Sequence, residues 1–183
     1  MSETTTYLAE GARVGIRLFS YEDAEEFTGL ARESRSLHHP WLFPPEDTES
    51  FLLYARRLIE DPAKAGFLVC AREGDPAGRI AGFININNIV EGAFLSGTLG
   101  YGAFAHAAGR GLMAEGLALV TRYAFGPLGL HRLEANIQPA NEGSLALVRR
   151  AGFRLEGYSP DFLLIDGAWR DHQRWAITAE LVR

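Results

Sequence analysis

The stretch Gly109-Arg110-Gly111-Leu112-Met113-Ala114-Glu115 opens an apolar-periodic run that ends at Gly126-Pro127. Two glycines one residue apart predict a tight turn, and the run that follows predicts a helix over residues 111–125. Such a turn leaves backbone N–H groups free at the positive end of a helix dipole, where they can bind an anion. The stretch therefore predicts a turn that holds a cofactor bearing a pyrophosphate.

Two other interpretations of this turn stay open on the residues alone. The pattern Gly109-x-Gly111-x-x-Ala114 satisfies the dinucleotide-binding fingerprint, which normally follows the first strand of a doubly wound sheet. Here it lies past the middle of the chain, and too few strand–helix units follow it. A tight turn without a ligand is the second alternative. The segment Asn141-Glu142-Gly143-Ser144 favours a ligand, because it places a polar pair at the head of another helix.

Strand-like and helix-like runs alternate on both sides of the turn. Upstream, Ser20 opens a helix that runs to about Ser34, and Thr48 is the expected N-cap of a second helix. The other runs are a strand over 14–18, an antiparallel meander of strands over 66–72, 79–89 and 93–104, a strand over 131–138, a helix over 142–151, and strands over 162–165 and 174–180 joined by an Asp166-Gly167 hairpin.

This order of elements predicts an α+β fold, or three-layer α/β, in one domain over residues 1–183. We expect a mixed, mostly antiparallel central sheet of six to seven strands with helices on both faces.

The bulk composition excludes several classes of function. The chain has 183 residues, 47% hydrophobic and 22% charged, and a formal net charge of −5 without a long basic run, which argues against DNA binding. The single cysteine, Cys70, lies in an apolar run and is expected to be a buried strand residue, and one cysteine permits no internal disulfide. The polar start of the chain and the absence of an apolar run of ~18–20 residues predict a cytoplasmic protein without a membrane partner.

Five segments occur in an informative order: Gly109–Glu115, His131–Asn136, Asn141–Ser144, Ala151–Tyr158 and Phe162–His172. Together they resemble the GCN5-related N-acetyltransferases (GNAT), and more narrowly the RimJ/RimL group of ribosomal-protein-alanine N-acetyltransferases. The resemblance covers nearly the whole chain.

This resemblance implies the GNAT fold, acetyl-CoA as co-substrate, no metal, and a homodimer as one oligomeric form. It implies direct transfer of the acetyl group, in a ternary complex, to a primary amine such as the N-terminal α-amino group of a protein. A small-molecule or antibiotic amine as acceptor is one alternative. A catalytically weak acyl-CoA-binding regulator is another, because Ala108 stands where the family signature has Gln or Arg.

The resemblance also implies the residues of the site. Ser144 would protonate the leaving thiolate, Glu134 is the first candidate for the base, with Asp161 and Glu91 as weaker ones, and a backbone N–H at Ala103 would steady the oxyanion. An ion pair with Arg132 or Arg149 is the alternative role for Glu134. The expected cofactor-binding residues are Ala103, Phe104, Gly109, Arg110, Gly111, Leu112, Met113, Ala114 and Asn141.

The acceptor side is expected near a loop rich in aromatic residues. Trp41 and Phe43 would line the acceptor slot. The adjacent His38 and His39 lack the further ligands of a metal site in the sequence. His172 follows the hairpin, where a structural role is favoured over a catalytic one.

Overall fold

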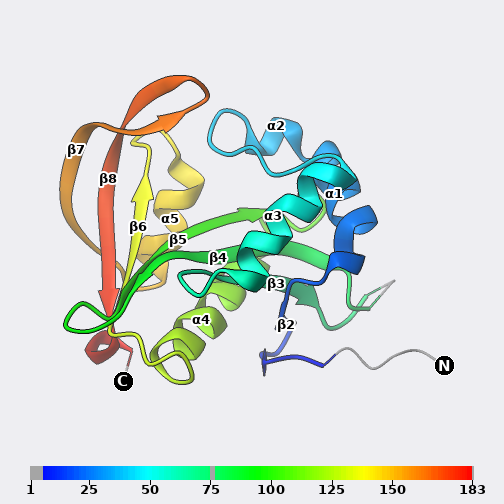
Figure 1. Cartoon of the computed structure of the whole chain (residues 1–183), viewed down its shortest axis with the longest axis horizontal. Helices are drawn as coiled ribbons and strands as arrows, with labels where there is room; N and C mark the ends of the chain where they lie inside the picture. Colours follow the sequence, from blue (N-terminus) through cyan, green and yellow to red (C-terminus); the bar gives the residue numbers. More distant parts are fainter. Residues whose placement is uncertain (1–5, 75–76, 183) are drawn as a thin grey trace.

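The computed structural model describes residues 6–74 and 77–182. Within these residues, eight strands form one sheet in the order β1-β2-β3-β4-β5-β6-β8-β7 (Figure 1). All neighbouring pairs are antiparallel except β5 and β6, which are parallel. The strands are β1 (Ala9–Glu10), β2 (Val14–Leu18), β3 (Ala65–Ala71), β4 (Ile80–Val90), β5 (Ser96–Ala103), β6 (Arg132–Ile137), β7 (Arg154–Ile165) and β8 (Ala168–Thr178).

Helices lie on both faces of this sheet, as the sequence predicts. They are α1 (Ala24–Glu33), α2 (Arg35–His38), α3 (Thr48–Glu60), α4 (Leu112–Phe125) and α5 (Glu142–Arg150). In the part of the chain that the structure describes, no helix has the length and apolarity to cross a membrane.

The alternation of side chains along β3 shows how the two layers of helices are held. Phe67 and Val69 belong to the core cluster that includes α4 and α5, whereas Leu68 and Cys70 belong to the cluster that includes α1 and α3. Successive side chains of a strand point to opposite faces, so α4 and the α1–α3 layer cover opposite sides of the sheet. Cys70 is fully buried, as predicted, and burial raises the pKa of its thiol to about 11.

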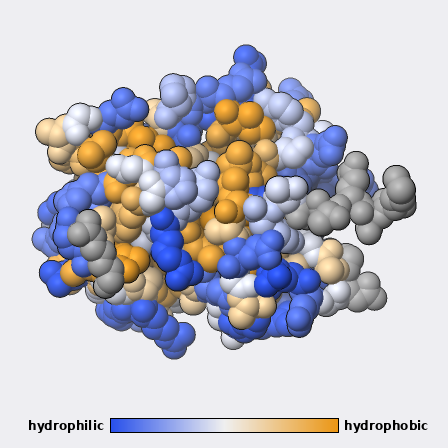
Figure 2. All heavy atoms as spheres, turned by 90° about the horizontal axis from the view of Figure 1, so that it is seen from below, coloured by the Kyte–Doolittle hydropathy of each residue, from blue (hydrophilic) through white to orange (hydrophobic). Residues whose placement is uncertain are grey.

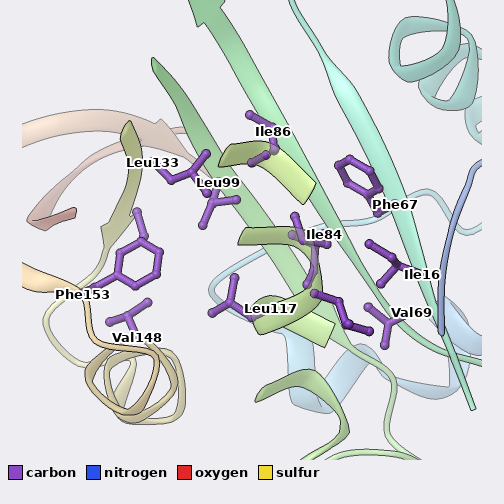
Figure 3. Close-up of a cluster of buried hydrophobic side chains, with 14 of the residues drawn as sticks. Ile16, Phe67, Val69, Ile84, Ile86, Leu99, Leu117, Leu133, Val148 and Phe153 are labelled. Atoms are coloured by element: carbon purple, nitrogen blue, oxygen red, sulfur yellow. The ribbon is translucent and has the colours of Figure 1, made fainter. Parts of the chain in front are cut away.

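The larger core cluster runs without interruption from the first strands to α5 (Figure 3). In Figure 3, Leu117 of α4 lies between Ile84 of β4 on one side and Val148 and Phe153 on the other. Val148 and Phe153 extend the cluster to α5 and the chain that follows it. This continuous packing fixes the two helices whose N-termini flank the candidate site.

The surface of the molecule also carries hydrophobic residues. They appear in several patches across the middle of the face seen from below, with hydrophilic residues around them (Figure 2). The exposed hydrophobic residues include several on the β7–β8 hairpin, among them Leu164 and Trp169. The hairpin turn at Asp166-Gly167 has positive φ at both residues, as an Asp-Gly pair predicts.

Four expectations from the sequence need correction. The strand β8 begins at Ala168 rather than at residue 174. The sheet has eight strands rather than six to seven, because Ala9–Glu10 pairs with β2 as a short edge strand. Asp47, not Thr48, caps α3, since its side chain accepts the Ser50 N–H. The strand β7 begins at Arg154 rather than at Phe162.

The early start of β7 has a physical reason. Gly157 and Pro160 interrupt the alternation of side chains, and the register with β8 shifts at two places. An edge strand tolerates both residues, because only one of its sides must form hydrogen bonds to a neighbour.

Candidate functional site

The two parallel strands at the centre of the sheet separate at one end. Their register runs from Ser96 opposite Arg132 to Leu99 opposite Ala135 and stops there. Beyond that pair, β5 continues to Ala103 along β4, and β6 continues along β8. The diverging strand ends form a V-shaped opening.

A cavity of about 320 Å³ occupies one side of this opening. Its walls come from the end of β5, the glycine turn with the start of α4, the start of α5, and the segment around α2. Six residues predicted to bind the cofactor line it in addition to Asn141: Ala103, Gly109, Gly111, Leu112, Met113 and Ala114.

The glycine turn has the conformation that an anion-binding turn requires. Gly109 and Gly111 have φ values of 72° and 77°, a left-handed conformation that costs glycine little. Within the described residues, the N–H groups of residues 109–114 donate to no protein acceptor. They are therefore free to bind a pyrophosphate at the N-terminus of α4.

The start of α4 is held in place by Glu115. Its carboxylate accepts the Arg13 N–H at 2.8 Å and the Val14 N–H at 3.3 Å, and it pairs with the Arg13 guanidinium. Arg13 also donates to the carbonyl of Arg110 at 2.8 Å. Although burial opposes ionisation, these donors lower the pKa of the Glu115 carboxyl. These contacts tie the glycine turn and the first turn of α4 to Val14 at the start of β2 and to Arg13 just before it.

Tyr101 and Ser144 meet across the mouth of the V. Their hydroxyl oxygens are 2.6 Å apart, and both residues line the cavity. Ser144 is placed by α5, whose N-cap Asn141 accepts the Ser144 N–H. Burial raises the pKa of Tyr101 to about 12, so its hydroxyl keeps its proton near neutral pH.

The open edge of β5 presents backbone groups to the cavity. The Ala103 carbonyl accepts a hydrogen bond from His38 Nε2 at 2.7 Å, while the next N–H, that of Phe104, donates to Ala81 of β4. In a strand the N–H and C=O of one residue point to the same side, so the Ala103 N–H points away from β4. The Ala103 N–H is therefore available to a ligand that lies along this open edge of β5.

A second cavity of about 140 Å³ adjoins the first on the β6 side of the V. The two share Trp41, Leu42, Tyr101, Asn141 and Ser144. The second cavity adds residues from the end of β6, from the middle of β5, and His172. The Tyr101–Ser144 pair therefore lies where the two cavities meet.

The structure places four predicted site residues away from both cavities. Phe104 is fully buried in the α1–α3 cluster, and Phe43 is exposed beside His39. Arg110 lines a separate surface pocket. Glu134 pairs with Arg132 at 2.9 Å, which is the alternative role that the sequence left open for it. Neighbours two apart on a strand share a face, so this pairing is built into the local sequence.

Two side-chain contacts at this site were not predicted from the sequence. The side chain of Tyr101 could not be paired with Ser144, because 43 residues separate them. His38 was predicted as part of the loop along the acceptor slot and weighed as a metal ligand, but its hydrogen bond to the Ala103 carbonyl was not predicted. In the described ranges, no three His, Cys, Asp or Glu side chains group as a metal site would require.

Comparisons with known proteins identify the family of this chain. Residues 13–154 match the family model of the acetyltransferase (GNAT) domain. The chain is 37% identical over 172 residues to the [ribosomal protein uS5]-alanine N-acetyltransferase of Escherichia coli, covering 91% of this chain and 88% of that protein.

Solved structures share the fold. RimJ of Mycobacterium smegmatis in complex with CoA-disulfide superimposes with a TM-score of 0.82 at 30% identity, over 91% of this chain and 82% of that one. A spermidine N-acetyltransferase of Vibrio cholerae in complex with CoA and spermine gives 0.77 at 19% identity, over 92% and 97%, which shows the fold alone. The chain therefore belongs to the GNAT family of acetyl-CoA-dependent N-acetyltransferases.

Proposed function

We propose that this enzyme transfers the acetyl group of acetyl-CoA to the N-terminal α-amino group of a protein. The observation that carries the proposal is the pair of cavities that meet at Tyr101 and Ser144. One cavity has the donors for a pyrophosphate, and the other reaches the same two hydroxyls from the opposite side of the V. A donor and an acceptor can thus approach one point without a covalent enzyme intermediate.

The cofactor would enter along the first cavity. The N–H groups of residues 109–114 would bind its pyrophosphate, and the dipole of α4 would add ~0.3–1 kcal/mol to this contact. Its pantetheine arm would lie along the open edge of β5 beside Asn141. The thioester carbonyl would then receive the N–H of Ala103 as negative charge develops on its oxygen.

The leaving thiolate needs a proton, and the Tyr101–Ser144 pair can supply it. The Ser144 hydroxyl would donate to the sulfur while it accepts from Tyr101, which keeps its proton because its pKa is about 12. Proton transfer of this kind contributes ~10²–10⁴-fold to a rate. Tyr101 recovers its proton from the nitrogen of the tetrahedral intermediate.

The lining of the second cavity bears on the acceptor. Among the residues that the structure describes there, the polar side chains are amides, hydroxyls and the His172 imidazole, with no Asp or Glu. A polyamine carries several positive charges. When these charges leave water, they need carboxylates to pair with. A single α-amine fits this lining better. The relative with 37% identity, which acts on a protein alanine, supports the same class.

The experiment compares acetylation with binding. The wild type should acetylate peptides with a free N-terminal alanine, and Ser144→Ala should lose ~10²–10⁴-fold in kcat with unchanged affinity for acetyl-CoA in calorimetry. If the wild type binds acetyl-CoA and acetylates no peptide in a broad panel, the proposal fails and the regulator alternative is supported.

A further inference from the structure

The second cavity is lined by a titratable residue, His172, that has no role in the chemistry described above. Its described lining holds two titratable groups, Tyr101 and His172. Tyr101 stays protonated near neutral pH, since burial raises its pKa to about 12. His172 is therefore the group in this cavity that can take a proton from an acceptor.

The backbone fixes which nitrogen of His172 carries the hydrogen. The ring Nδ1 lies 2.8 Å from the carbonyl oxygen of Arg170, and a carbonyl only accepts. In the neutral ring Nδ1 is therefore the donor, and Nε2 carries a free lone pair. The residue as a whole is 3% exposed, and its ring centroid lies 6.1 Å from that of Phe162, so the ring orientation is held.

Nε2 itself remains accessible. It makes no hydrogen bond within the described residues, and it is not among the side-chain atoms that are cut off from solvent without a partner. His172 is one of the residues that line the second cavity, which gives Nε2 a route to an acceptor. His38 is the opposite case: its Nε2 donates to Ala103, and its Nδ1 is sealed without a partner.

The carboxylates considered from the sequence do not compete for this role. Glu134 is paired with Arg132 and lines neither cavity, and Asp161 and Glu91 are absent from both linings. Asp171, beside the histidine in sequence, hydrogen-bonds to the Tyr158 hydroxyl and to the Asp161 N–H. The cavity that reaches Ser144 thus has the imidazole as its base.

We infer that His172 Nε2 is the general base that deprotonates the acceptor ammonium in the second cavity, an assignment that rests on the proposed function. The ammonium gives one proton to Nε2, and the neutral amine then attacks the thioester carbonyl. The C–N bond forms, the C–S bond breaks, and the second proton from nitrogen ends on the thiol through Tyr101 and Ser144. His172 releases its proton to solvent, which leaves an amide, coenzyme A and one free proton.

The test separates the base from a structural histidine with two variants. In His172→Asn the side-chain amide N–H replaces Nδ1–H toward the Arg170 carbonyl, while Nε2 is lost. His172→Ala loses both the N–H toward the Arg170 carbonyl and Nε2, and it opens space for a small added base. We expect kcat for an alanine-start peptide to fall ~10²–10⁴-fold in both variants, with acetyl-CoA affinity unchanged in calorimetry.

Two further results are expected only if His172 acts as a general base. Added imidazole should restore part of the kcat of His172→Ala. An aminooxyacetyl peptide, whose nitrogen is neutral at pH 7, should be acetylated by His172→Asn with a much smaller defect. Ala118→Gly, on the exposed face of α4, is the control for general loss of stability.

Wild-type kcat in His172→Asn overturns the inference, as does a defect that neither imidazole nor the neutral nucleophile relieves. Failure of the proposed function looks different, because it appears in the wild type. A wild type that acetylates other amines but no peptide overturns the acceptor, and His172 is then tested on those amines. A wild type inert toward every amine overturns both.

Discussion

The hydroxyls of Tyr101 and Ser144 are 2.6 Å apart, although one comes from the sheet and the other from the first turn of α5. Each is placed by its own element: Tyr101 by the pairing of β5 with β4, and Ser144 by the Asn141 cap. The contact joins the two cavities at one point. In the proposed mechanism, the proton donor for the thiolate and the entry of the acceptor would therefore share this position.

The two hydroxyls should act as one unit. Tyr101→Phe removes the proton that replenishes Ser144, so we expect kcat to fall ~10²–10⁴-fold, as for Ser144→Ala. The double variant should lose little more than either single one, because partners in one proton path are not additive. Steady-state kinetics of the three variants checks this. Fully multiplicative losses would show that the two residues act independently.

The tie between Glu115 and β2 should depend on pH. The pKa of Glu115 is below its ordinary value of 4.5, so its contribution to stability is present above pH 4.5 and is lost as pH falls through the lowered value. Glu115→Gln should lower the free energy of unfolding by ~1–3 kcal/mol at pH 7. Urea unfolding should show this difference shrinking below pH 4.5. A difference that stays constant with pH would contradict the tie.

Two glycines in helices should respond in opposite directions to alanine. A Cβ at Gly116 of α4 would lie 2.7 Å from Val69 Cγ2, so Gly116→Ala should destabilise the fold by ~1–3 kcal/mol. A Cβ at Gly29 of α1 would have its nearest neighbour at 3.8 Å, and Gly29→Ala should stabilise by ~0.5–1 kcal/mol. Thermal unfolding measures both. Equal shifts would mean that the close approach of α4 to β3 is not tight.

Restoring the family's residue type at Ala108 should strengthen the binding of acetyl-CoA. Ala108 lines the first cavity beside the glycine turn, where the family signature has Gln or Arg. Ala108→Arg should therefore tighten acetyl-CoA binding several-fold in calorimetry, since a guanidinium can pair with a phosphate. Ala118→Arg places the same charge on the exposed face of α4 and should change affinity less. Equal gains would indicate a general charge effect.

The features that were predictable from the sequence are local ones. The turn at Gly109 and Gly111 and the hairpin at Asp166-Gly167 follow from backbone preferences within a few residues, and both are present. The apolar periodicity after the glycine turn predicts a helix over residues 111–125, and α4 spans Leu112–Phe125.

The features that were missed depend on tertiary structure. No local pattern could pair Tyr101 with Ser144 or place His172 in a cavity that β6 and the Trp41 loop help to form. Glu134 lies on the predicted strand, but Arg132 two residues earlier shares its face and pairs with it. The start of β7 was missed because Gly157 and Pro160 break the alternation that predicts a strand.

The site of acetylation on a peptide tests the central claim most directly. Wild-type enzyme and acetyl-CoA are incubated with a peptide that has a free N-terminal alanine and an internal lysine, with the same peptide blocked at its N-terminus, and with spermidine. Tandem mass spectrometry then locates the acetyl group. We predict a single acetyl on the α-amine of the free peptide and none on the blocked one. Acetylation of the lysine, or of spermidine alone, would contradict the account.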